Sequence, residues 1–163
     1  MLSSNNRGTN KNTKLKNLRK KEKNMGKHAI IVIKNKENEY LQYFDDKWNS
    51  YLFLNCKMEN KDDVKSIINE VRKCFAVSDE SIKCSFVGEK THKKFSEKDK
   101  IEKEYTHYFY IVDLLEPIEK FSKNEFESLD RQYKWFAYDE LLQDERIQKV
   151  NNDIVRYIKE FNI

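Results

Sequence analysis

Apolar segments separated by polar turns predict three strands between residues 28 and 54. His28–Ile33 is a short, β-branched, continuously apolar run, which is typical of a strand covered on both faces. A polar turn at residues 35–38 leads to Glu39–Phe44, which we expect to return as the hairpin partner of the first strand. After a second polar turn at Asp45–Lys47, Tyr51–Leu54 is the third apolar strand.

An amphipathic pattern predicts a helix over Asp62–Ala76. Its apolar residues repeat at the spacing of one helix face: Val64, Ile67, Ile68, Val71, Cys74 and Phe75. Asn60 or Asp62 can cap its first turn. A second amphipathic helix is predicted near Glu145–Phe161, after a turn of helix that opens at Asp139–Leu142.

Three more apolar segments predict the remaining strands. They are residues 81–88, 104–115 and 133–136, with a charged loop at residues 89–103 between the first two. One face of the strand at 104–115 carries Tyr105, His107, Phe109 and Ile111. The order of elements predicts an α+β fold, a mixed β-sheet flanked by helices as an α/β/α sandwich.

Charge divides the 163-residue chain into a basic tail, residues 1–26, and a folded domain, residues 27–163. Residues 1–27 hold nine of the 32 Lys and Arg but one of the 28 Asp and Glu, so residues 28–163 carry 23 basic and 27 acidic residues. A general nucleic-acid-binding face on the folded domain is therefore not supported. The tail is rich in Asn, Lys and Ser and has few apolar residues to bury, so we expect it to be disordered.

The tail and the cysteines bear on partners and localisation. The tail can contact RNA or an anionic membrane surface; the simpler alternatives are a solubilising leader, or a chain that starts at Met25 and not at Met1. No segment approaches the roughly 18 consecutive apolar residues that span a bilayer. Cys56, Cys74 and Cys84 lack metal-ligand spacing and lie in segments that we expect to be buried, so we interpret them as free thiols of a cytoplasmic protein.

The stretch from Asn55 to Val77 resembles the signature motif of the Nudix family, G-x5-E-x7-R-E-U-x-E-E-x-G-U, where U is a bulky aliphatic residue. Without gaps, the defined positions of the motif fall on Asn55, Lys61, Asn69, Glu70, Val71, Lys73, Cys74, Ala76 and Val77. The family's glutamates hold Mg²⁺ ions against a diphosphate. Of these carboxylates only Glu70 is present, and a one-residue slip in the loop adds Asp62. The resemblance therefore implies a Nudix-like domain with a degenerate hydrolytic motif.

The resemblance extends over residues 27–161. Residues 48–54 resemble the strand that leads into the Nudix loop, and residues 133–142 resemble the late strand-to-helix step. Several stretches are also similar to the SMODS-associated Nudix group of bacterial cyclic-oligonucleotide systems: Trp48–Asn55, His92–Ser96, Tyr133–Phe136 and Asn151–Val155. That similarity implies a sensor or effector of a nucleotide signal in anti-phage defence.

The candidate ligand-binding residues are Trp48, Lys57, Glu70, Lys73, His92, Lys93 and His107. Lys73 occupies a metal-ligand position of the motif and can neutralise a phosphate without metal, although Glu70 and Lys73 can also form a simple surface ion pair. Trp48, beside a polar turn, can stack on a base, and His92 can bind an anion. His107 is more often a core or cleft residue than a catalyst.

Three functional hypotheses remain open. The one we favour is a nucleotide-binding Nudix-fold module, catalytically weak or inactive and without a cofactor. The second is an active Nudix-type phosphohydrolase of nucleoside diphosphate derivatives, which uses Mg²⁺ with Glu70, Asp62 and non-standard ligands such as Glu59, Glu89 or Glu104. The third is a protein-interaction scaffold with a vestigial cleft.

Overall fold

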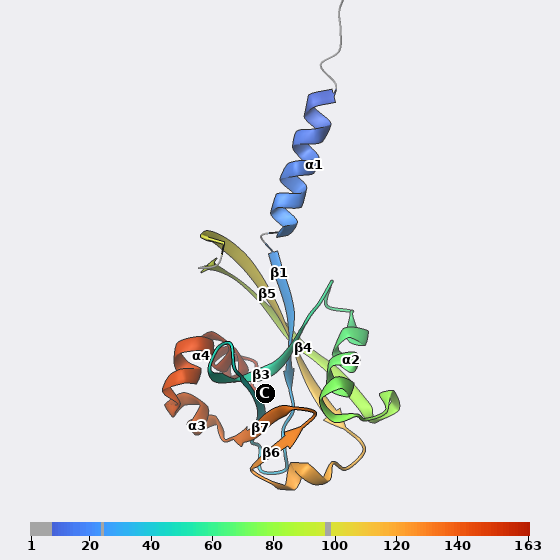
Figure 1. The fold of residues 1–163 in the computed structure, drawn as a ribbon, viewed down its shortest axis with the longest axis vertical. Coiled ribbons are helices and arrows are strands. Elements are labelled where there is room, and N and C mark those ends of the chain that lie inside the picture. Colours follow the sequence, from blue (N-terminus) through green and yellow to red (C-terminus); the bar gives the residue numbers. More distant parts are fainter. Residues whose placement is uncertain (1–7, 24, 97–98) are drawn as a thin grey trace, which may run out of the picture. The chain divides into compact units, whose positions relative to one another are not determined.

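A mixed seven-stranded sheet with flanking helices forms the fold of the computed structural model, which describes residues 8–23, 25–96 and 99–163 (Figure 1). In chain order the elements are α1 (Gly8–Lys23), β1 (Met25–Val32), β2 (Tyr40–Asp45), β3 (Ser50–Lys57), α2 (Val64–Phe75), η1 (Asp79–Ser81), β4 (Ile82–Ser96), β5 (Ile101–Leu114), η2 (Glu119–Ser122), β6 (Glu125–Ser128), β7 (Arg131–Phe136), α3 (Tyr138–Gln143) and α4 (Glu145–Glu160). Neighbouring strands follow the order β4-β5-β1-β3-β2-β7-β6. The predicted α+β class is confirmed.

The residues group into two compact units. One comprises residues 27–90 and 107–163, and the other comprises the chain up to residue 26 together with residues 91–106. The first unit contains both hydrophobic clusters and the larger part of the sheet. That residues 27–163 form one domain stays a prediction.

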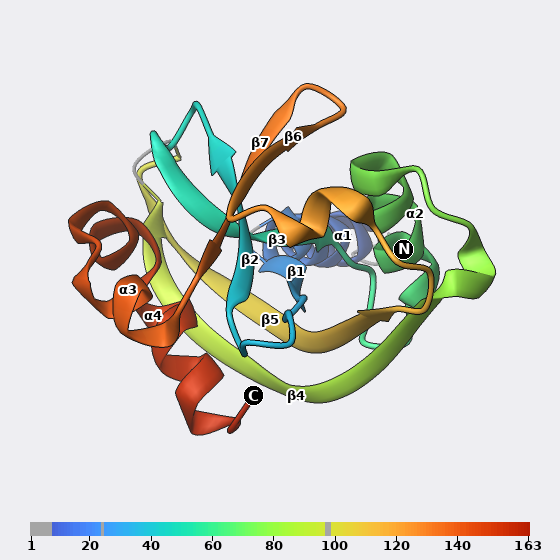
Figure 2. The same cartoon turned by 90° about the horizontal axis from the view of Figure 1, so that it is seen from below.

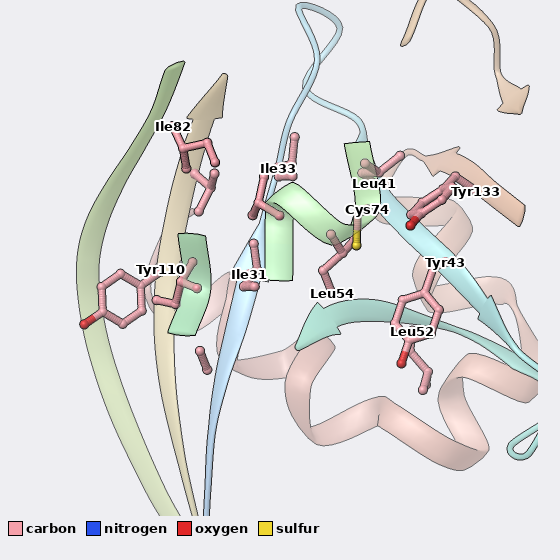
Figure 3. Packing of buried hydrophobic residues seen from close by; sticks show 14 of the residues in the cluster. Ile31, Ile33, Leu41, Tyr43, Leu52, Leu54, Cys74, Ile82, Tyr110 and Tyr133 are labelled. Atoms are coloured by element: carbon pink, nitrogen blue, oxygen red, sulfur yellow. The ribbon is translucent and has the colours of Figure 1, made fainter. Parts of the chain in front are cut away.

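Helices cover both faces of the sheet in the larger unit. Figure 2 shows α2 on one face and α3 with α4 on the other. On the α2 face, Ile67, Val71 and Cys74 pack against apolar side chains of the sheet. Figure 3 shows a part of this cluster. On the other face, the side chains of α3 and α4 pack against residues such as Phe53 and Phe109. The predicted amphipathic stripes therefore become the two layers of the core.

The predicted hairpin between the first two strands is wrong. β3 lies between β1 and β2, so these two strands are not neighbours in the sheet. Beyond the end of β1, an isolated bridge between Lys34 and Tyr40 connects the chain to the start of β2. Leu52 and Leu54 face the α2 cluster, whereas Phe53 faces the opposite cluster. Because β3 is buried on both faces, it takes a central place with a partner on each side.

The predicted charged loop at residues 89–103 is largely strand. β4 continues to Ser96 and β5 begins at Ile101, so the two form a long hairpin. Within this hairpin, the hydroxyls of Thr91 and Thr106 lie 2.9 Å apart. Most of the described residues between 89 and 103 are exposed, and the segment lacks the apolar alternation that marks a half-buried strand.

The basic tail contains helix α1, whereas the sequence predicted disorder. Residues 1–7 and 24 lie outside the described residues. The segment has many good helix formers, including Lys, Arg, Leu and Glu, and no proline. The described side chains at 11–19 are all exposed, so the helix forms without burying them. Among the described residues, no helix is long and apolar enough to cross a membrane.

Helix α2 is capped by Asp63, and neither Asn60 nor Asp62 takes that role. The Asp63 carboxylate accepts a hydrogen bond from the Ser66 backbone N–H at 3.4 Å and another from the Ser66 hydroxyl at 2.7 Å. The hydroxyl contact is the main cause that lowers the pKa of Asp63 below its usual value. The carboxylate therefore satisfies one of the donors at the start of the helix.

We expect Asp63→Ala to lower the free energy of unfolding by about 1 kcal/mol, because the first turn of α2 loses its acceptor. Asp63→Asn keeps an acceptor oxygen and serves as the matched control. Urea titrations of the three proteins measure the effect. An alanine variant as stable as the asparagine variant would show that the cap contributes nothing.

Candidate functional site

Glu70, the one carboxylate at the glutamate positions of the predicted motif, forms an ion pair with Arg131 at the start of β7. Arg131 Nη1 lies 3.4 Å from Glu70 Oε1, and the two side chains are 43% and 16% exposed. Ile67 and Cys74, one turn away on either side along α2, are buried. Glu70 therefore lies beside the buried face of the helix, and its carboxylate meets a protein cation.

Arg131 is positioned by an aromatic ring as well as by Glu70. Its guanidinium lies 4.6 Å from the centre of the Tyr43 ring. The Tyr43 hydroxyl donates a hydrogen bond to Asp45 and accepts one from Asn55, each at 3.3 Å. Stacking on a fixed ring limits the orientations of the guanidinium, so its remaining N–H groups are presented in a defined direction.

The Cys74 side chain closes the site on the helix side. Figure 3 shows its sulfur atom directed toward the sheet, near Tyr43 and Tyr133. Arg131 Nη1 lies 3.9 Å from Cys74 Sγ, and the Ser128 hydroxyl donates to the Cys74 carbonyl at 2.8 Å. Burial is the main cause that raises the pKa of the Cys74 thiol, so the thiol stays protonated near neutral pH.

The thiol of Cys56 on β3 is influenced by the charges of both Glu70 and Lys73. Burial raises the pKa of Cys56 to about 12, with further contributions from the carboxylates of Glu70 and Asp63 and an opposing one from the Lys73 ammonium. The side chain of Lys73 is exposed, yet its charge acts on the same thiol as the charge of Glu70. Within the described ranges, Glu70 pairs with Arg131 and forms no ion pair with Lys73.

The residues present do not fit a magnesium ion. The described part of the chain contains no group of three or more His, Cys, Asp or Glu side chains that could hold a metal. Asp62 lies in the loop before α2, where its backbone N–H donates to Asn60 at 2.8 Å. Glu70 shares its surroundings with a guanidinium and a thiol, whereas Mg²⁺ requires several oxygen ligands.

The other predicted site residues are distributed over the fold. Trp48 lies in the turn between β2 and β3 and is 52% exposed, and Lys57 lies at the opposite end of β3. His107 on β5 lies next to His28. The remaining two belong to the smaller unit: His92 stacks on Tyr105, and Lys93 lies 3.9 Å from Glu102. The structure thus brings Glu70 and Lys73 together but does not place all seven residues in one cluster.

Arg131 was missed in the sequence. It is 61 positions from Glu70, and no motif spacing relates the two. Its placement depends on a turn in which Leu129 and Asp130 both have left-handed backbone angles, with φ of 47° and 65°. An aspartate before a β-rich segment is a weak turn signal, and leucine in this conformation is unusual, so the hairpin of β6 and β7 was not predicted.

Helix α2 ends at a residue in the left-handed conformation. Ala76, at the position of the motif's glycine, has φ 52° and ψ 36° and ends the helix in the left-handed region. Its N–H donates to the Arg72 carbonyl at 2.8 Å. Alanine is strained there because its Cβ approaches the following carbonyl oxygen.

Comparison with known proteins identifies the fold. No family model and no curated protein matches the chain. The structure is similar to an Ap4A hydrolase from C. elegans, with 13% identity and a TM-score of 0.55 over 85% of this chain and 96% of that one. It is also similar to a MutT protein from Methanosarcina mazei Go1, with 14% identity and a TM-score of 0.52 over 85% of this chain and 95% of that one. A Nudix hydrolase from Nitrosomonas europaea is similar as well, with 12% identity and a TM-score of 0.55 over 84% of this chain and 87% of that one. These similarities show that the chain has a Nudix-like fold.

We expect Ala76→Gly to raise the free energy of unfolding by about 1 kcal/mol, because glycine relieves the left-handed strain at the end of α2. The control is Ala137→Gly, at an ordinary φ of −63°, which should be neutral or destabilising. Thermal and denaturant unfolding measure both variants. If Ala76→Gly is no more stable than the wild type, the left-handed conformation does not strain the alanine.

Native Cys56 should react with iodoacetamide at pH 8 about a thousandfold more slowly than in the unfolded chain, because its pKa is raised from 9.0 to about 12 and only the thiolate reacts. The rate should rise about tenfold per pH unit as the pH approaches 12. Peptide mapping by mass spectrometry gives the rate for each cysteine. Equal rates in the native and unfolded protein would disprove the shift.

Proposed function

We propose that this domain binds a nucleotide through its phosphate groups, with protein cations in place of the metal ions that Nudix hydrolases use. The observation that carries the proposal is the ion pair of Glu70 with Arg131, which joins the motif helix to β7. The fold supports a nucleotide derivative as the ligand, since the similar solved structures are an Ap4A hydrolase and Nudix hydrolases.

The charge of the site favours an anion. Arg131 neutralises the single carboxylate, and Lys73 adds a further positive charge one turn along the helix. A guanidinium has five N–H donors in a planar fork, and its contacts with Glu70 and Cys74 both use Nη1. Nε and Nη2 therefore supply a pair of donors that matches two phosphate oxygens.

The same end of the sheet offers a surface for the base. Tyr43 pairs with Tyr133 in the ladder between β2 and β7, so Arg131, two residues earlier, lies level with the end of β2. The turn that follows β2 carries Trp48, whose side chain is half exposed. We assign base stacking to Trp48 and phosphate binding to Arg131 and Lys73.

Hydrolysis is weak or absent in this proposal. Cleaving a diphosphate requires stabilisation of the developing charge and activation of a water, and the family's carboxylates supply both through metal ions. Here the positions of the paired glutamates hold Lys73 and Cys74. The resemblance to the SMODS-associated group supports a further step, in which the domain senses a nucleotide signal in bacterial anti-phage defence.

Calorimetric titration tests the site directly. The ligands are ATP, ADP-ribose, Ap4A and cyclic di- and trinucleotides, each with and without Mg²⁺. For the ligand that binds, we expect Lys73→Glu and Arg131→Gln each to lose about 2 kcal/mol of binding free energy, because each removes a charge-assisted contact with phosphate. The matched control is Arg72→Gln, since Arg72 is exposed beside Lys73 but pairs with Asp79 at 3.1 Å.

The alternatives give different outcomes. Unchanged affinity in both site variants would refute the roles of Lys73 and Arg131. Robust Mg²⁺-dependent turnover that Glu70→Gln abolishes would establish the hydrolase, whereas a protein that binds none of these ligands would be a scaffold. A melting curve of each variant shows whether lost binding reflects lost folding.

A further inference from the structure

Three basic side chains form a row across adjacent strands, away from the site on α2. His28 on β1 pairs in register with Lys57 on β3. The imidazole rings of His28 and His107, which lies on β5, have centroids 6.4 Å apart. Because β5, β1 and β3 are consecutive in the sheet, the three side chains lie side by side.

This row is on the face of the sheet that α4 covers. Ile30 and Phe109, two residues along the strands from His28 and His107, belong to the hydrophobic cluster under α4. Side chains two apart on a strand point to the same face, whereas neighbours point to opposite faces. Cys56 packs toward α2, so the adjacent Lys57 faces the other side.

The row carries the positive charge of Lys57 at the border of an apolar core. Burial is the main cause that lowers the pKa of His28, and the ammonium of Lys57 lowers it further. The nearby Lys90 on β4 is already paired with Glu160 on α4 at 2.8 Å. Among the described residues, no carboxylate forms an ion pair with Lys57.

We propose that His28, His107 and Lys57 form a second anion site, which binds a phosphate group on the face opposite α2. A protonated imidazole and an ammonium supply N–H donors side by side, which suits the several oxygens of a phosphate better than the two of a carboxylate. Phosphate binding favours the charged imidazole of His28, so affinity is highest at low pH and falls as His28 loses its proton. The site is independent of the nucleotide site proposed above.

Titration of the imidazole resonances tests this site in the full chain. The pKa of His28 is measured by NMR with inorganic phosphate, with AMP and with adenosine. We expect phosphate and AMP to raise it by about one unit, which corresponds to a tenfold preference for the protonated form, and adenosine to leave it unchanged. A response to AMP alone would assign the phosphate to a nucleotide, and a response to both would assign it to the phosphate group itself.

Matched variants separate a site from general surface charge. Lys57→Gln and His28→Gln should weaken phosphate binding at pH 6 at least tenfold, whereas Lys83→Gln, which removes an exposed lysine on β4, should leave it within twofold. Arg131→Gln, which removes a cation of the nucleotide site, should leave the phosphate response of the His28 resonance unchanged, so that failure of one site is distinguishable from failure of the other. Equal effects of Lys57→Gln and Lys83→Gln, or no phosphate response at His28, would overturn the proposal.

Discussion

The alternation of side chains along β3 connects the two layers of the larger unit. This strand lies at the centre of the sheet, and each of its neighbours in sequence faces a different helix layer. Leu52 and Leu54 contribute to the cluster under α2, and Phe53 contributes to the cluster under α4. The same alternation carries Cys56 toward Glu70 and Lys57 toward His28. A slip of one residue in its register would exchange both cores and both candidate sites.

In the site on α2, the carboxylate of Glu70 meets a cation of the protein. A Nudix motif gathers carboxylates on one helix face, where their mutual repulsion is relieved by bound Mg²⁺. At the predicted motif positions of this chain, Lys73 and Cys74 stand in place of two carboxylates, and Arg131 pairs with Glu70. In the function that we propose, the site therefore lacks the Lewis acid that hydrolysis requires.

Buried and half-buried polar groups distinguish this site from ordinary core packing. Tyr43 links Arg131 to Asp45 and Asn55, and Ser128 satisfies a carbonyl near the end of α2. These contacts join the motif helix to the hairpin of β6 and β7, which the family motif does not include. The ion pair is partly exposed, so its contribution to stability is small, and its main consequence is the fixed position of the guanidinium.

The sequence by itself determined the elements that have strong apolar periodicity and, through the motif, the position of Glu70 and Lys73 on one helix. The stripes of α2 and α4 and the continuous runs of β1 and β3 each predict a buried surface, and hence the sandwich. Only the tertiary structure decided that β3 separates β1 from β2, because strand order depends on which strands must be covered on both faces. It also decided the pairing of Glu70 with Arg131 and of His28 with His107 and Lys57. Such contacts join residues that are far apart along the chain, and no local pattern of charge or hydrophobicity specifies them.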